Sequence, residues 1–221
     1  MTRSYEQTCF IARALDVLGE RWTLLIVREL ALGPRRYVDL LSALPGLGTS
    51  LLAARLKHLE QHDVLRRTTL PGPGHTAAYE LTDRGEALMP ALAGLAEWGT
   101  GLEDPPPGYT DRVAWTTLAM RLTAPAEAAR FDTLTELVVS GEALWLRGDG
   151  ERVRLETGRA PIPPGLRLTC EKETFYALAR GQVTVDGAVA SGQLVIDGEA
   201  ETARLFFELF RLPDGHRTSS Q

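Results

Sequence analysis

The side chains best suited to binding a polyanion gather in one segment of the first half of the sequence. Between Arg35 and Ala78 the chain has six basic residues against three acidic ones. The whole protein of 221 residues is acidic, with 24 Lys and Arg against 29 Asp and Glu and a net charge of −5. Phosphate contacts depend on local positive charge more than on the total charge. The segment therefore predicts a nucleic-acid contact, and its basic residues are Arg35, Arg36, Arg55, Lys57, Arg66 and Arg67.

Two other patterns bear on metal binding and catalysis. His58 and His62 are one helical turn apart and can present two nitrogen ligands to a metal ion. A structural zinc site needs about four ligands, and no cysteine or third ligand accompanies this pair, so we expect both histidines to be solvated. The sequence has neither a recognisable nucleophile motif nor a phosphate-binding loop. We therefore expect no metal, no cofactor and no enzyme activity.

Cys9 is a residue whose chemistry the sequence leaves open. It would lie in the first turn of a helix with Arg13 one turn further along, and a helix N-terminus and a cation both favour the thiolate form. The alternative is that Cys9 is a small, buried apolar residue. The second cysteine, Cys170, is distant in the sequence, so the pair provides no disulfide framework.

Short helices must position the basic side chains. Apolar residues recur at helical spacing in four segments, and Thr49 or Ser50 can act as the N-cap of the fourth. The third and fourth helices are separated by a glycine-containing turn, which is typical of a helix-turn-helix. The predicted helices cover residues 9–18, 21–32, 37–44 and 49–61.

A hairpin and a long helix follow the predicted helix-turn-helix. Residues 64–70 and 77–81 are expected to form two strands joined by a tight reversal, and a hairpin at this point is a wing. A long helix then begins at Thr82 or Asp83, with Asp83 and Glu86 as a capping pair, and runs toward Leu102. Its apolar stripe extends beyond what a small domain needs, which predicts a dimer surface.

The fourth helix is the candidate recognition helix. With Leu52, Leu56 and Leu59 placed inward, the outward face is small and polar. Small residues allow a helix to lie deep in the major groove, where alanine can contact a thymine methyl group. The alternative is a solvated helix of an interaction domain. The residues that we expect at the DNA contact are Arg35, Arg36, Thr49, Ser50, Ala53, Ala54, Arg55, Lys57, His75 and Thr76.

Three consecutive prolines at positions 105–107 divide the chain, because they forbid a helix and favour an extended connection. We expect one domain over residues 1–104 and a second over residues 109–215. The second half mixes strands with helices, so the fold class is α+β. The strands are predicted over 134–139, 143–147, 152–156, 166–170 and 192–196, and the helices over 171–180 and 199–212.

The first half also carries a series of short motifs in a characteristic order. They are Leu18-Gly19-Glu20-Arg21-Trp22-Thr23, Arg28-Glu29-Leu30, Gly33-Pro34-Arg35-Arg36-Tyr37, Leu56-Lys57-His58-Leu59-Glu60, Tyr79-Glu80-Leu81-Thr82-Asp83-Arg84-Gly85 and Glu97-Trp98-Gly99. Over nearly all of residues 8–102 this order resembles the HxlR family of MarR-like bacterial winged-helix regulators. The resemblance implies a homodimer formed by the terminal helices, with each fourth helix in a major groove. Cys9 matches an N-terminal cysteine that senses electrophiles or oxidants in some members.

A second series of motifs lies near the end of the chain. It comprises Leu178-Ala179-Arg180-Gly181, residues 189–199, and Leu205 with Leu209-Phe210. Over about residues 130–212 it resembles the closing portion of the type 2 sterol-carrier-protein fold, which implies a sheet and helices that enclose an apolar tunnel for lipids or other hydrophobic molecules. The candidate lining residues, with plain core packing as the alternative, are Trp115, Trp145, Phe175, Tyr176, Phe206 and Phe210.

These features predict a cytoplasmic, homodimeric transcription regulator whose C-terminal domain binds a hydrophobic small molecule and thereby alters DNA affinity. The expected partners are double-stranded DNA, a second copy of the chain and the hydrophobic effector. No membrane is expected, because the sequence has neither a long apolar segment nor a signal peptide. Two alternatives stay open: a small-molecule binding protein or enzyme that keeps the winged helix as a scaffold, and a regulator that senses oxidants through Cys9.

Overall fold

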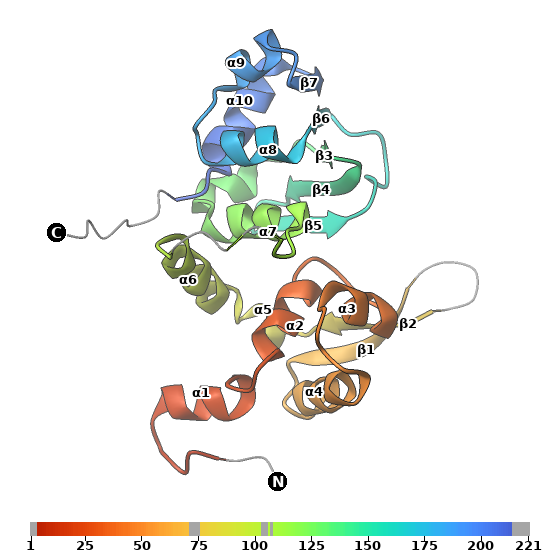
Figure 1. The fold of residues 1–221 in the computed structure, drawn as a ribbon, viewed down its shortest axis with the longest axis vertical. Helices are drawn as coiled ribbons and strands as arrows, with labels where there is room; N and C mark the ends of the chain where they lie inside the picture. Colours follow the sequence, from red (N-terminus) through yellow and green to blue (C-terminus); the bar gives the residue numbers. More distant parts are fainter. Residues whose placement is uncertain (1–3, 71–75, 103–105, 107, 214–221) are drawn as a thin grey trace, which may run out of the picture. The chain divides into compact units, whose positions relative to one another are not determined.

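The computed structural model describes residues 4–70, 76–102, 106 and 108–213, and the chain forms two compact units, residues 1–92 and residues 93–221 (Figure 1). The division expected at the three prolines stays a prediction, since that segment lies partly outside the described residues. No described helix is long and apolar enough to span a membrane.

The first unit consists of short helices and one hairpin. Its first four helices begin and end within two residues of the predicted bounds, because glycine and proline interrupt the apolar pattern between them. The core is formed by the apolar faces of α2, α3 and α4, whose Ile26, Leu40 and Leu52 are completely buried. The elements are α1 (Phe10–Leu18), α2 (Thr23–Leu30), α3 (Tyr37–Ala43), α4 (Thr49–Gln61), β1 (Leu65–Leu70), β2 (Thr76–Leu81) and α5 (Asp83–Glu86).

Strands β1 and β2 form the predicted hairpin. They pair in an antiparallel register in which Leu65 is opposite Leu81 and Leu70 is opposite Thr76. The reversal itself, residues 71–75, lies outside the described residues.

The prediction of one long helix from Thr82 to Leu102 is wrong. The structure has α5 (Asp83–Glu86) and then a separate α6 (Met89–Thr100). Pro90 explains the break, because proline has no N–H to donate to a preceding carbonyl and is tolerated in the first turn of a helix. The expected Asp83–Glu86 capping pair is replaced by Thr82, whose hydroxyl accepts a hydrogen bond of 3.1 Å from the Gly85 N–H.

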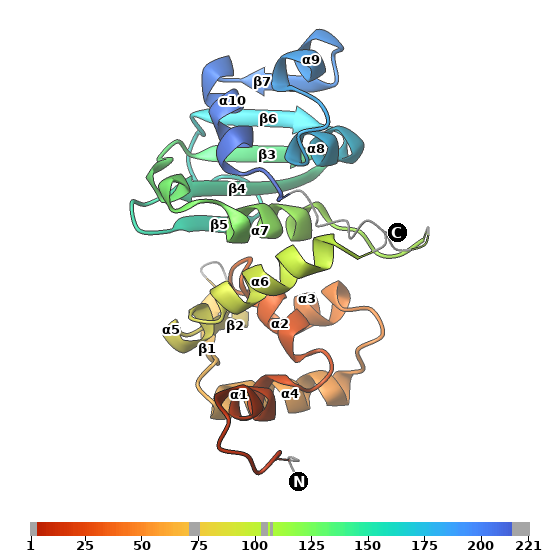
Figure 2. The same ribbon diagram turned by 90° about the vertical axis from the view of Figure 1, so that its left-hand side faces the viewer.

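The second unit is built on a mixed five-stranded sheet in the order β5-β4-β3-β6-β7. Strands β3 and β6 are parallel and the other neighbours are antiparallel. Figure 2 shows α7, α8 and α10 on one face of this sheet. The elements are α7 (Val113–Thr123), a 3-10 helix (Ala126–Arg130), β3 (Thr135–Val139), β4 (Glu142–Gly148), β5 (Val153–Thr157), β6 (Leu166–Cys170), α8 (Lys172–Ala179), α9 (Val185–Ala190), β7 (Leu194–Asp197) and α10 (Ala200–Leu209).

A buried carboxylate lies on the sheet face opposite to the buried leucines of β3 and β4. Glu136 is 2% exposed and accepts hydrogen bonds from Arg167 Nε at 2.6 Å, the Ala160 N–H at 3.0 Å and Arg159 Nη1 at 3.2 Å. Burial alone would raise the pKa of Glu136, but these bonds to the charged form outweigh it and the pKa is lowered. The carboxylate therefore stays ionised and holds the segment 159–160 against the sheet.

Candidate nucleic-acid interface

Helix α4 presents the face that its sequence predicts. Leu52, Leu56 and Leu59 are buried, so this side of the helix packs against the first unit. The outward side is exposed and carries small or polar residues, which leaves the backbone accessible to a groove. The exposed small or polar residues of α4 are Thr49, Ser50, Ala53, Ala54, Lys57 and Gln61, and Leu51 is also exposed.

The start of α4 differs from the prediction. The N-cap is Gly48 rather than Thr49 or Ser50, and no side chain caps the helix. The chain turns one residue earlier because Leu47 is buried before the helix and the Tyr37 hydroxyl donates a hydrogen bond of 2.7 Å to the Thr49 carbonyl. The N–H groups of the first turn therefore have no side-chain cap, and such groups are suited to contact a phosphate.

Most basic side chains near α4 are already paired with a carboxylate. Isolated surface ion pairs contribute only about 0–1 kcal/mol to stability, so a phosphate can compete for these guanidinium groups. Arg36 and Asp39 are three residues apart, a spacing that sequence reasoning can find, whereas Glu20 and Arg55 meet only through the fold. The pairs are Arg36 with Asp39 at 2.7 Å, Arg55 with Glu20 at 2.7 Å, Arg66 with Glu80 at 2.7 Å and Arg67 with Glu60 at 3.3 Å.

Lys57 is the contrasting case. It is exposed on the outward face of α4 and makes no ion pair with any described residue. Its ammonium group has no competing carboxylate to leave before it contacts a phosphate. Lys57 is therefore the cation on this face that is most available to a polyanion.

Arg35 has a structural task that the sequence did not reveal. Its backbone exchanges two hydrogen bonds with Tyr79, of 2.9 and 2.8 Å, and its Nε donates to the Glu29 carbonyl at 3.4 Å. These bonds tie the segment before α3 to β2. Of the two wing residues predicted to contact DNA, Thr76 is exposed at the start of β2, and His75 lies outside the described residues.

Both histidines at the end of α4 were predicted to be solvated, and this is confirmed for His62 but wrong for His58. His58 is half-buried, and its Nε2 lies 3.1 Å from the Val17 carbonyl of α1, so this contact joins the two helices. His62 is exposed, with its ring centre 4.6 Å from that of His58. The two residues are 41 and 45 positions from Val17, which explains why local spacing did not predict the contact.

Cys9 is exposed at the N-cap of α1, which excludes the buried alternative for the single chain. Hydrogen bonds from the backbone of Ala12 and then of Ile11 lower the pKa of the Cys9 thiol. The Arg13 guanidinium lies over the Phe10 ring, 5.8 Å from its centre. The helix N-terminus thus favours the thiolate, as the sequence predicted.

The six aromatic residues predicted to line a tunnel in the second unit do not share one environment. Phe175, Phe206 and Phe210 are completely buried, and the rings of Phe206 and Phe210 lie 5.0 Å apart. Trp145 is half-buried and alternates with buried Leu144 and Leu146, so it lies on the other face of β4.

The remaining two aromatic residues lie on helices. Trp115 is half-buried on α7, and the Tyr176 hydroxyl of α8 donates a hydrogen bond of 2.7 Å to Asp111. Burial and then this carboxylate raise the pKa of Tyr176. The tyrosine therefore stays protonated and fixes the start of α7 to α8.

Comparisons with known proteins divide the chain as the two resemblances do. Residues 17–105 match the family described as HxlR-like helix-turn-helix, and residues 117–211 match the SCP-2 sterol transfer family. YvaP of Bacillus subtilis, described as an uncharacterized HTH-type transcriptional regulator, is 40% identical over 93 residues, which are 42% of this chain and 86% of YvaP. The transcriptional regulator YodB of Bacillus subtilis is 34% identical over 92 residues, which are 42% of this chain and 82% of YodB.

A crystal structure described as quinone-bound YodB from Bacillus subtilis is also similar. It is 31% identical, covers 43% of this chain and 100% of its own, and has a TM-score of 0.37.

Proposed function

The chain belongs to the HxlR-like helix-turn-helix family of transcriptional regulators, and from this premise we propose that it binds double-stranded DNA as a homodimer through α4. The observation that carries the proposal is the outward face of α4. Its residues are small or polar and exposed, and it carries the ammonium group of Lys57, which pairs with no carboxylate among the residues that the structure describes. The residues that we propose at the DNA contact are those expected from the sequence: Arg35, Arg36, Thr49, Ser50, Ala53, Ala54, Arg55, Lys57, His75 and Thr76. A regulator of this kind is a binding protein and not an enzyme.

Exposed apolar side chains support the homodimer. On α1 the side chains of Ile11 and Leu15 are 71% and 41% exposed, and on α6 those of Leu95 and Trp98 are 50% and 69% exposed. Large apolar residues grouped on a helix face usually mark a protein interface. These two helices are the terminal helices of the winged-helix segment, so a second copy is the partner that we propose for them.

The first test is footprinting of the wild-type protein on the DNA upstream of its own gene. A homodimer with one α4 per protomer should protect two half-sites about one helical turn, or 10 base pairs, apart. Because the contacts are largely ionic, the affinity should fall linearly with salt on logarithmic axes, with a slope of about −0.9 per phosphate neutralised. If the protein protects no DNA at low salt, the scaffold alternative replaces this proposal.

We also propose that the C-terminal unit binds a hydrophobic small molecule that changes DNA affinity. The match of residues 117–211 to the SCP-2 sterol transfer family supports this part. Cholesterol is a suitable probe because it is apolar and uncharged. At saturation it should shift the dissociation constant for DNA by about 5- to 150-fold, the usual range of coupling between two sites. Sterol binding without any shift would exclude a sensor role for this unit.

A redox response is the second candidate function, and the position of Cys9 favours it. The thiol is exposed at a helix N-terminus, and its pKa is lowered there. Cys9→Ser should leave DNA binding in reducing buffer within about twofold of wild type and abolish the loss of DNA binding caused by diamide. Footprinting before and after diamide measures both. The control is Cys170→Ser, because Cys170 is buried and burial raises its pKa to about 11. A diamide response that persists in Cys9→Ser contradicts the sensor role.

A further inference from the structure

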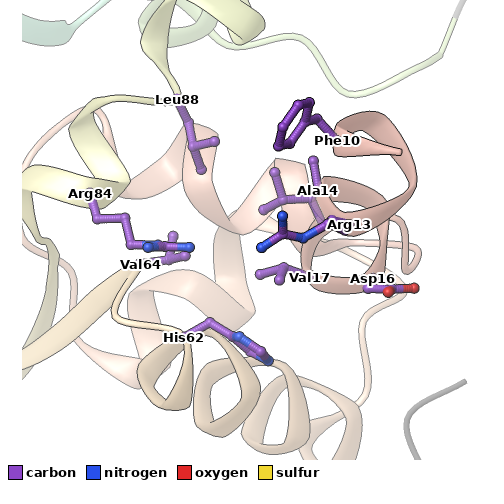
Figure 3. A pocket seen from close by; sticks show the side chains of 10 residues that line it. Phe10, Arg13, Ala14, Asp16, Val17, His62, Val64, Arg84 and Leu88 are labelled. Atoms are coloured by element: carbon purple, nitrogen blue, oxygen red, sulfur yellow. The ribbon is translucent and has the colours of Figure 1, made fainter. Parts of the chain in front are cut away.

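A cavity of about 600 Å³ lies within the first unit, between α1, the end of α4, the start of β1 and the segment around α5 (Figure 3). This volume is in the range of small-molecule sites, about 300–1,000 Å³. The cavity is separate from the outward face of α4, because the α4 residue that lines it is His62, the C-cap. No part of the proposed DNA contact uses it.

Two arginines converge on this cavity without a carboxylate partner. Figure 3 shows Arg13 of α1 and Arg84 of α5 pointing toward one another across it. Neither forms an ion pair with any other residue in the described part of the chain. The acidic residue of the lining, Asp16, points away from them in Figure 3, and its carboxylate accepts hydrogen bonds from Ser4 Oγ at 2.9 Å and the Tyr5 N–H at 2.8 Å.

The cavity also contains a histidine, His62, whose pKa is lowered. Burial first, and then the charges of His58 and Arg84, lower the pKa of His62. The His62 ring is therefore neutral near pH 7, while the two guanidinium groups keep their charges. A bound anion would relieve the repulsion between them, and charge-assisted hydrogen bonds to guanidinium are among the strong ones.

The rest of the lining is apolar. It is formed by Phe10, Ala14, Val17, Leu18, Val64 and Leu88, and the Phe10 side chain is 82% exposed. An inorganic anion would leave this apolar surface in water, and a neutral lipid would leave both arginines unpaired. A ligand that pairs with the two arginines and also covers the apolar lining has a negatively charged group and a compact apolar body.

We propose that this cavity binds a small organic carboxylate, with the carboxylate between Arg13 and Arg84 and an apolar ring or chain against Phe10, Val64 and Leu88. The stoichiometry is one molecule per chain. The cavity spans three elements that are distant in sequence, so the bound molecule bridges α1 and α5.

The bound molecule would contact α1 and α5, and each of these helices is tied to α4 or to the segment just after it. His58 of α4 contacts the Val17 carbonyl of α1, and Thr82, the N-cap of α5, bonds through its hydroxyl to the Asp63 carbonyl just after α4. The Thr82 N–H also donates to the Val64 carbonyl at 3.1 Å. Ligand binding at this cavity is therefore coupled to the placement of α4, a step that rests on the DNA-binding function proposed above.

Calorimetric titration of the full-length protein with naphthalene-2-carboxylate tests the site. We expect saturable binding at one molecule per chain, and binding at least tenfold weaker for naphthalene-2-carboxamide, which has the same body without the charge. Arg13→Gln and Arg84→Gln should each weaken carboxylate binding at least tenfold, because each removes one charged partner. Arg147→Gln, an exposed arginine of the other unit, should leave it within twofold of wild type.

Three results would overturn the site: no binding at millimolar carboxylate, equal binding of the carboxamide, or unchanged binding in both pocket variants. If sedimentation shows instead that these variants weaken self-association, the cavity receives a second copy of the chain and the proposal is wrong. Saturating carboxylate should shift the dissociation constant for DNA at least fivefold in wild type and not in Arg84→Gln. If the protein binds the carboxylate but binds no DNA, the carboxylate site is confirmed and the proposed DNA-binding function is wrong.

Discussion

Gly85→Ala should destabilise the first unit by about 3 kcal/mol, the upper end of the range for overpacking. A Cβ added at Gly85 would lie 2.1 Å from the Val64 carbonyl oxygen and 3.0 Å from Leu81 Cδ2. The oxygen belongs to the backbone and accepts the hydrogen bond from the Thr82 N–H, so it cannot move aside without breaking the junction between β1 and α5.

Differential scanning calorimetry measures this effect, because it resolves the two units if they unfold separately. For a unit of this size, the loss corresponds to a fall in Tm of about 12–24 °C in its transition. The control is Gly94→Ala in α6, where an added Cβ meets nothing within 4 Å; residue 94 belongs to the second unit, so the transition of the first unit should not change. Alanine favours a helix over glycine by about 1 kcal/mol, so the control should melt at or slightly above the wild-type temperature. A Gly85→Ala protein that melts within about 3 °C of wild type would show that the junction can relax.

Lys57→Glu should weaken DNA binding by about 100-fold at low salt. Each hydrogen bond to a charged group contributes about 1.5–3 kcal/mol, and the lower end of this range is roughly tenfold in affinity. A homodimer loses two such contacts. The salt dependence should become shallower by about 1.8 in slope, since each phosphate contact contributes about 0.9. Fluorescence anisotropy on a labelled duplex over a range of salt concentrations gives both numbers.

The matched control for this substitution is Lys172→Glu, because Lys57 and Lys172 are the two lysines of the chain and both are exposed. Lys172 lies at the start of α8, in the second unit. The two variants change the net charge equally, so a loss of affinity confined to Lys57→Glu reports the position and not the total charge. Equal losses in both variants would assign the effect to long-range electrostatics and would remove α4 from the contact.

Local sequence determined most of the elements. The spacing of apolar residues is a property of a few consecutive helical turns. It predicted α4 over residues 49–61, and it also predicted that Leu52, Leu56 and Leu59 are buried, without information about the elements that pack against them. The same holds for the hairpin of β1 and β2 and for the strands of the second unit. The exception is the helix predicted from Thr82 to Leu102. Its apolar stripe continues past Pro90, but proline has no N–H to continue the helical hydrogen bonds.

The tertiary structure alone decided which polar side chains meet. Glu20 pairs with Arg55 across 35 positions, His58 contacts α1 across 41, and Arg13 faces Arg84 from another helix. It also placed Trp145 on the sheet face away from the buried leucines and left Cys9 exposed at a helix end. Such arrangements depend on how complete elements pack. Hydrophobic periodicity fixes which face of an element is buried, but it carries no information about which distant charge lies beside it.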